Sequence, residues 1–75
     1  MPFVNIRTIK GLLTDEQKKL LHKKITDVMV EVEGQGDESF RQNIWIYIED
    51  EEPINCSQGG FWATPEYIAG LHKKK

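Results

Sequence analysis

The sequence predicts an α+β fold built on a small β-α-β unit whose two strands are parallel. Residues 3–9 alternate between two faces, as a strand does, and residues 43–48 are rich in β-branched and aromatic side chains. Between them, a capping motif is followed by apolar residues at helical spacing. Two strands joined through a helix run parallel with a right-handed crossover. We expect this unit to be followed by a C-terminal hairpin strand and a short helix.

The first strand begins directly behind Pro2 in "MPFVNIRTIK". Alternation places Val4, Ile6 and Thr8 on the face shared with Pro2, and Phe3, Asn5, Arg7 and Ile9 on the other. Pro2 has two interpretations. It begins a strand, where its missing N–H is tolerated, or removal of Met1 leaves its nitrogen as a free secondary amine.

A helix should follow "TDEQ", which matches a capping box between Thr14 and Gln17. The apolar face of this helix is predicted from helical spacing to comprise Leu21, Ile25, Val28, Met29 and Val32. We expect Gly34 to end the helix by adopting the left-handed conformation.

The second half of the chain begins with the strand predicted at residues 43–48, after the loop "GQGDES". The segment "QGGFWA" predicts a Gly-Gly turn followed by a short edge strand. Thr64 and Pro65 are placed as the N-cap and first residue of a C-terminal helix, "PEYIAGL".

The length of 75 residues predicts a single domain, residues 1–75. A chain this short buries only about 60% of the surface that it exposes when unfolded, so it needs further stabilisation. Cys56 is the only cysteine, which excludes an intrachain disulfide and suits a reducing compartment. His22, His72 and Cys56 lack the spacing of zinc ligands, so no metal site is predicted. Oligomerisation remains as the stabilising factor.

The charge balance predicts no general attraction to nucleic acid, because the chain has 12 acidic and 10 basic residues and a net charge of −2. The acidic run at 49–52 and the basic tail at 72–75 are typical of solvated surface. The longest apolar run, "IWIYI", is far shorter than the roughly 20 residues that cross a bilayer. With no signal-peptide pattern, we expect a cytoplasmic protein without nucleic-acid or membrane partners.

Both faces of the predicted sheet are apolar, since Ile44, Ile46 and Ile48 point to one face and Trp45 and Tyr47 to the other. One long helix covers only one face, and a two-stranded sheet is marginally stable alone. We therefore expect identical subunits to form a closed, symmetric oligomer.

Pro2 before a strand, "TDEQKKLLHKKI", "IWIYIED" and the later Gly-Gly turn together resemble the 4-oxalocrotonate tautomerase family over about the first sixty residues. The resemblance implies a β-α-β subunit, a homohexamer or homotrimer, and Pro2 as the catalytic base after Met1 is removed. Its implied reaction is the ketonisation of a small enol or 2-hydroxy-dienoate acid, without metal or organic cofactor. Residues 61–75 form a longer tail than the shortest family members have.

The resemblance does not carry over the arginines of the best-studied members. Leu12 and Leu13 stand where one is expected, and Ile44 or Trp45 stands where the other is. The family's diacid substrate is therefore not implied, because bidentate arginine is what matches a carboxylate. Arg41, Arg7 and Trp45 are the candidate substrate-binding residues instead.

Two alternatives stay open. Pro2 could serve a hydratase, dehalogenase or decarboxylase acting on an unsaturated acid, which would need a carboxylate to position water. The other is a non-catalytic oligomeric binding protein on the same scaffold, which the missing arginines favour, because a fold does not by itself establish function.

Overall fold

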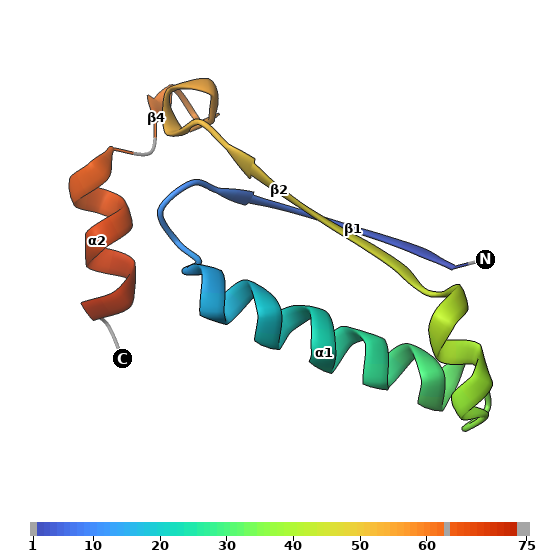
Figure 1. The fold of residues 1–75 in the computed structure, drawn as a ribbon. Coiled ribbons are helices and arrows are strands. Elements are labelled where there is room, and N and C mark those ends of the chain that lie inside the picture. The colour runs from blue at the N-terminus through green and yellow to red at the C-terminus, as the bar shows by residue number, and fades with distance from the viewer. Residues whose placement is uncertain (1, 63, 74–75) are drawn as a thin grey trace.

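The fold is a two-stranded parallel sheet with a long helix along one face and a small C-terminal hairpin and helix at one end (Figure 1). The computed structural model describes residues 2–62 and 64–73, and for 72 and 73 the backbone alone. In chain order the elements are β1 (Phe3–Ile9), α1 (Asp15–Val32), the 3₁₀ helix η1 (Glu38–Asn43), β2 (Trp45–Glu51), the 3₁₀ helix η2 (Pro53–Asn55), β3 (Ser57–Gln58), β4 (Phe61–Trp62) and α2 (Pro65–Lys73). Met1 and residues 74 and 75 of the basic tail lie outside the described residues.

The β-α-β prediction is confirmed: β1 and β2 pair in parallel, from Phe3 opposite Trp45 to Ile9 opposite Glu51. The predicted faces are also found. Ile44, Ile46 and Ile48 are half-buried, whereas Trp45 and Tyr47 are each 56% exposed. In Figure 1, α1 runs along one side of the sheet, so the aromatic face is left without cover.

Strand β2 begins two residues later than predicted and ends at Glu51 instead of residue 48. The preceding residues form η1, whose N-cap Asp37 accepts a hydrogen bond from the Ser39 N–H at 3.0 Å. The strand extends into the acidic run because it pairs with β1 as far as Ile9 opposite Glu51. Arg7 Nε of β1 lies 3.7 Å from a carboxylate oxygen of Glu49 and 3.6 Å from one of Glu51. The acidic run therefore lies mostly in a strand, with Asp50 and Glu52 exposed as expected and Glu49 and Glu51 half-buried.

Helix α1 starts as predicted, with both hydrogen bonds of the capping box formed between Thr14 and Gln17 at 2.9 and 3.1 Å. The helix ends directly before Gly34, at Val32 with Glu33 as its C-cap, as predicted. The expected left-handed conformation of Gly34 was wrong: Gln35 and Gly36 adopt positive φ after the helix, and Gly34 does not. A Cβ atom on Gly34 would lie 2.8 Å from Cδ2 of Phe40. Glycine is needed here for the close approach of η1, not for a left-handed turn.

The predicted apolar face of α1 was partly wrong. Val28 and Val32 are 51% and 70% exposed, whereas Val30, which was not predicted, is 3% exposed. Val30 is covered because the chain folds back after α1, with the Gly36 N–H donating to the Val30 carbonyl at 2.9 Å and η1 packing on the helix. Lys18 of α1 pairs with Asp50 of β2, and this contact raises the pKa of the Lys18 ammonium group.

The C-terminal hairpin and helix form as predicted. Gly59 and Gly60 have φ of 61° and 85°, as a two-residue turn with two positive φ angles requires, and they join β3 to β4. The Thr64 hydroxyl accepts from the Tyr67 N–H at 3.1 Å at the start of α2. No helix within the described residues is long and apolar enough to cross a membrane.

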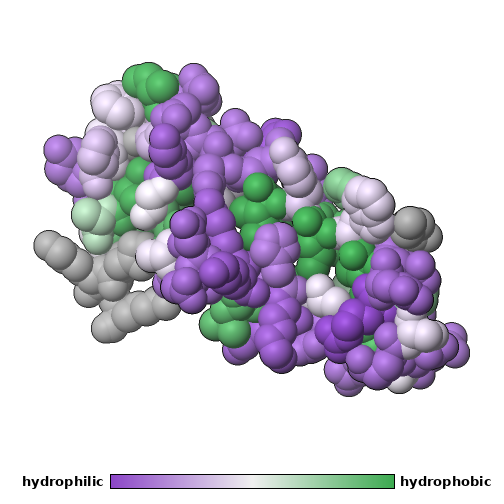
Figure 2. Space-filling view, in the orientation of Figure 1, coloured by the Kyte–Doolittle hydropathy of each residue, from purple (hydrophilic) through white to green (hydrophobic). Residues whose placement is uncertain are grey.

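The single chain has a small and open core. Among the described residues, Val30 and Ile68 are the buried hydrophobic side chains. The radius of gyration is 15.5 Å, against about 11 Å expected for a compact domain of this length. Figure 2 shows apolar residues still visible at the surface in the band between the sheet and α1.

Candidate functional site

Pro2 lies immediately before β1 and is half-buried. Its carbonyl oxygen accepts a hydrogen bond from the Trp45 N–H at 3.1 Å, at the end of the sheet where both strands begin. A proline nitrogen within a chain has no hydrogen to donate, so it takes no part in the strand ladder. The sheet therefore holds Pro2 by its carbonyl group and leaves its nitrogen free of hydrogen bonding between strands.

Trp45 follows Pro2 in the hydrogen-bond ladder, and its pairing with Phe3 places it, by strand alternation, on the face opposite Pro2. The indole stacks on Phe3, with ring centroids 6.5 Å apart and an interplanar angle of 26°. Phe3 is 61% exposed, and Trp45 is also more than half exposed. Within one chain, the two rings form an uncovered aromatic surface beside the residue that carries the candidate base.

Arg41 lies in η1, at the same end of the sheet as Pro2. Its Nη1 atom is 2.9 Å from Asp27 of α1, and its Nε and Nη2 atoms donate to the two carboxylate oxygens of Glu38 at 3.0 and 3.3 Å. The Glu38 and Asp27 carboxylates raise the pKa of Arg41. Hydrogen bonds from Lys23 and Arg41 lower the pKa of Asp27 from its ordinary value of 3.8. Arg41 is thus a positioned cation whose charge is already balanced by two carboxylates.

Arg7 does not lie at the end of the sheet that holds Pro2, Trp45 and Arg41. Its side chain is 70% exposed and lies between Glu49 and Glu51 on the face turned away from α1. Pro2, Trp45 and Arg41 therefore share one end of the sheet, and Arg7 lies farther along β1.

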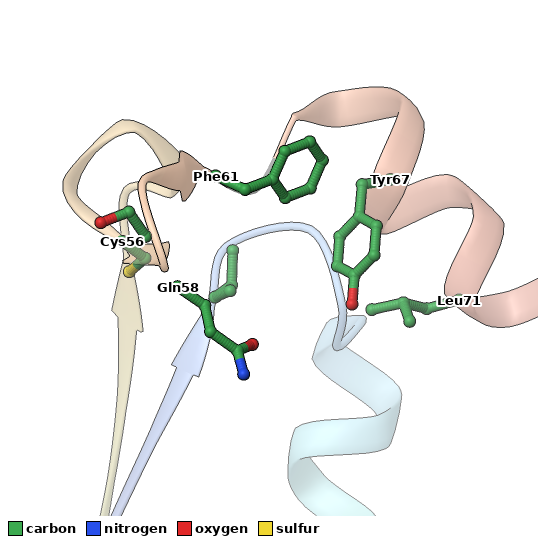
Figure 3. A pocket seen from close by; sticks show the side chains of 7 residues that line it. Cys56, Gln58, Phe61, Tyr67 and Leu71 are labelled. Carbon is green, nitrogen blue, oxygen red and sulfur yellow. The ribbon is translucent and has the colours of Figure 1, made fainter.

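Two open cavities of the described chain do not include Pro2. One, of about 330 Å³, is lined by residues of the hairpin, α2 and the last residue of β1, Ile9 (Figure 3). The other, of about 310 Å³, is lined by Lys10, Pro53 and Ile68 among others. A strand rises about 3.3 Å per residue, which places Ile9 roughly 20 Å from Pro2. Neither of these two cavities, as the described residues form them, offers a substrate site at Pro2.

Other reactive side chains add little at the Pro2 end. The Cys56 thiol is half-buried in the loop before the hairpin and donates to the Glu52 carbonyl at 3.7 Å. Across the part of the chain that the structure describes, no three His, Cys, Asp or Glu side chains are grouped so as to hold a metal ion.

The sequence did not identify the two partners of Arg41 or the cavity beside α2. Glu38 precedes Arg41 by three residues, a spacing that places side chains together in a helical turn. Asp27 lies on another element, and no local pattern connects it to Arg41. The cavity depends on how α2 packs, for which the one sequence signal is the pair of aromatic residues Phe61 and Tyr67.

Comparison with known proteins identifies the family. The family described as "Tautomerase enzyme" matches residues 2–52. Proteins named "Probable tautomerase" from Bacillus cereus and Bacillus anthracis are each 35% identical to this chain over 60 residues, which is 80% of this chain and 90% of each relative.

Solved structures agree. YwhB, described as a homologue of 4-oxalocrotonate tautomerase, superposes with a TM-score of 0.67 and 29% identity over 79% of this chain and 88% of its own. DmpI from Helicobacter pylori gives a TM-score of 0.64 and 30% identity over 81% and 94%. These likenesses confirm the resemblance that the sequence indicated and support an isomerase activity. The chain therefore belongs to the tautomerase family.

Proposed function

We propose that this tautomerase ketonises a small enol or 2-hydroxy-dienoate acid with the Pro2 nitrogen as its general base, after removal of Met1. The observation that carries the proposal is the placement of Pro2 in a chain whose family match begins at residue 2. The sheet binds Pro2 through its carbonyl group alone, at 3.1 Å from the Trp45 nitrogen. The nitrogen can therefore become a free amine without loss of a ladder hydrogen bond.

The chemistry needs an amine that is unprotonated near neutral pH. An ordinary terminal amine has a pKa near 8 (about 7.7–8.0), and a secondary amine is intrinsically more basic. Apolar surroundings or a neighbouring cation disfavour the protonated form and lower the pKa toward the working pH. The neutral amine then accepts the enol hydroxyl proton. The protonated amine returns a proton to carbon as the carbonyl group forms.

Arg41 is the proposed carboxylate-binding residue, because it lies at the Pro2 end and is 40% exposed. Trp45 is proposed as an aromatic wall and Arg7 as a second cation, and because both side chains lie on the face opposite Pro2 within one chain, each is proposed to act from another copy. Asp27 and Glu38 already balance Arg41, so its remaining attraction suits one carboxylate better than two. A monoacid is therefore the proposed substrate class.

The site is proposed to be completed between copies, in a homohexamer or homotrimer. Three features support assembly: the aromatic face of the sheet is uncovered, the core is small, and neither cavity described above reaches Pro2. Sedimentation at micromolar concentration tests this point, and a monomeric mass would contradict it.

The catalytic test combines intact mass with ultraviolet-monitored ketonisation of mono- and dicarboxylic enol acids. Protein that lacks Met1 should turn over a monoacid, and Pro2→Ala should lower kcat/KM by about 10²-fold or more. Pro53→Ala makes the same substitution at the start of η2 and should leave the rate unchanged. Processed protein that is no faster than buffer across the panel would refute the proposal.

Arg41→Gln separates binding from chemistry. If Arg41 binds the substrate carboxylate, this variant raises KM for the monoacid with little change in kcat. An unchanged KM would remove Arg41 from the site and leave the role of Pro2 intact.

A further inference from the structure

Arg41 is held by two carboxylates that come from different elements, Asp27 of α1 and Glu38 of η1. We propose that Asp27 is a positioning residue, which directs the Arg41 guanidinium to the side of the sheet on which Pro2 lies. Together with Glu38, it makes the site select a substrate with one carboxylate over a substrate with two. Since Arg41 is the proposed substrate-binding residue, this role of Asp27 rests on the proposed function.

The side of the sheet on which Arg41 lies decides whether it can meet a substrate at Pro2. Alternation along β1 places Pro2 on the face of Val4 and Ile6, whose side chains are half-buried. This is the face along which α1 runs (Figure 1). The Nη1 atom of Arg41 lies 2.9 Å from a carboxylate oxygen of Asp27, which belongs to α1. This contact therefore draws the Arg41 side chain to the same face as Pro2.

The backbone of η1 ties Arg41 to the end of the sheet where both strands begin. The Ile44 N–H donates to the Arg41 carbonyl at 3.2 Å. The next N–H along the chain, that of Trp45, donates to the Pro2 carbonyl at 3.1 Å. The backbone thus sets where Arg41 lies along the sheet, and Asp27 sets the direction of its side chain.

The two carboxylates leave part of the guanidinium free for a ligand. A guanidinium group carries five N–H donors. Glu38 accepts from Nε at 3.0 Å and from Nη2 at 3.3 Å, and Asp27 accepts from Nη1. Within the described residues, one donor on Nη1 and one on Nη2 remain, and the Arg41 side chain is 40% exposed. Two donors suffice for one substrate carboxylate.

Charge balance disfavours a second substrate carboxylate. Asp27 also accepts from the Lys23 ammonium group at 3.1 Å. The group formed by Lys23, Asp27, Glu38 and Arg41 therefore contains two cations and two anions. One substrate carboxylate gains the free N–H donors, whereas a second loses hydration and finds no unbalanced cation in this group. Removing the charge of Asp27 leaves an excess positive charge and should make a second carboxylate acceptable.

The test measures binding, which does not require turnover by Pro2. The full chain labelled with ¹⁵N-arginine has two Nε–H signals, because Arg7 and Arg41 are its only arginines, and Arg41→Gln identifies the signal of Arg41. Pentanoate and glutarate, a matched monocarboxylate and dicarboxylate, are titrated separately. Both should shift the Arg41 signal saturably, and pentanoate should bind at least as tightly as glutarate. No saturable shift at Arg41 would refute the inference, whereas intact binding without turnover would refute the role of Pro2 alone.

Asp27→Asn keeps an oxygen that can accept from Arg41 but removes the charge, so it should bind glutarate at least about threefold more tightly than the unmodified protein does. Glu31→Gln is the matched control on α1, because Glu31 is exposed and forms no ion pair among the described residues. It should leave both affinities unchanged. Asp27→Ala also removes the acceptor, and should bind pentanoate at least about threefold more weakly than Asp27→Asn does.

A double variant separates positioning of Arg41 from a merely structural role of Asp27. In the Arg41→Gln background, Asp27→Asn should change neither affinity, because the residue through which Asp27 acts is gone. Glu38→Gln removes the other balancing charge and should also strengthen glutarate binding, which keeps the test decisive if Asp27→Asn does not fold. Unchanged glutarate binding in the charge variants, or an equal effect of Asp27→Asn with and without Arg41, would overturn the inference.

Discussion

Replacing Gly34 with alanine tests how η1, which carries Arg41, is held against the end of α1. Gly34 has no positive φ, so its backbone does not demand glycine. An added Cβ, however, would lie 2.8 Å from Phe40 Cδ2, 2.9 Å from Phe40 Cβ and 2.8 Å from the Val30 carbonyl oxygen. The Val30 oxygen belongs to the backbone, and Phe40 Cβ is bonded directly to the backbone. Rotation of the Phe40 ring therefore cannot relieve these two contacts.

Two opposing effects set the size of the change. Overpacking in a well-packed region costs about 1–3 kcal/mol. Alanine also restricts the conformations of the unfolded chain, which raises the free energy of unfolding by about 0.4–1 kcal/mol. The net expectation is a loss of about 1–2 kcal/mol in the free energy of unfolding. With a urea slope of about 1 kcal/mol per M, the unfolding midpoint should fall by about 1–2 M.

The assay is urea unfolding followed by tryptophan fluorescence, with all variants at one protein concentration because assembly contributes to stability. Gly70→Ala is the matched control, because Gly70 lies within α2 and an added Cβ there meets nothing within 4 Å. That control should raise the midpoint slightly, by the helix preference of alanine over glycine. A Gly34→Ala midpoint at or above that of the unmodified protein would refute the packing argument.

Three further predictions concern the scaffold. Val30→Ala should lower the free energy of unfolding by about 2 kcal/mol. Val32→Ala, at a residue that is 70% exposed, should change it by less than about 0.5 kcal/mol. The urea unfolding midpoints of the two variants test this difference. Thr14→Ala removes the capping box and should cost about 1 kcal/mol and some helicity by circular dichroism; equal stability would contradict the cap. The Asp27 pKa is lowered by Lys23 and Arg41, so its stabilisation is present above its ordinary value of 3.8 and is lost as pH falls through the folded value. Asp27→Asn should therefore flatten the fall of the urea midpoint below about pH 4, and an unchanged profile would exclude this contribution.

The candidate base could be found from the sequence, whereas its surroundings could not. Pro2 stands out because a strand begins directly behind it and because the motifs that follow carry a family resemblance. The partners of Arg41 and the cavity beside α2 depend on how segments distant in the sequence pack together. No spacing rule links Asp27 with Arg41, or Ile9 with Tyr67.

Local structure was determined by the sequence itself, because its signals act between near neighbours. The capping box needs only Thr14 and Gln17, the hairpin turn needs Gly59 and Gly60, and the two sheet faces follow from alternation. Tertiary contacts decided the rest. Pairing with β1 as far as Ile9 continues β2 into the acidic run, where Arg7 lies beside Glu49 and Glu51. The return of the chain against α1 buries Val30 instead of Val32. These outcomes depend on contacts between residues of different elements. Such contacts contribute to the free energy of folding only when the chain has folded.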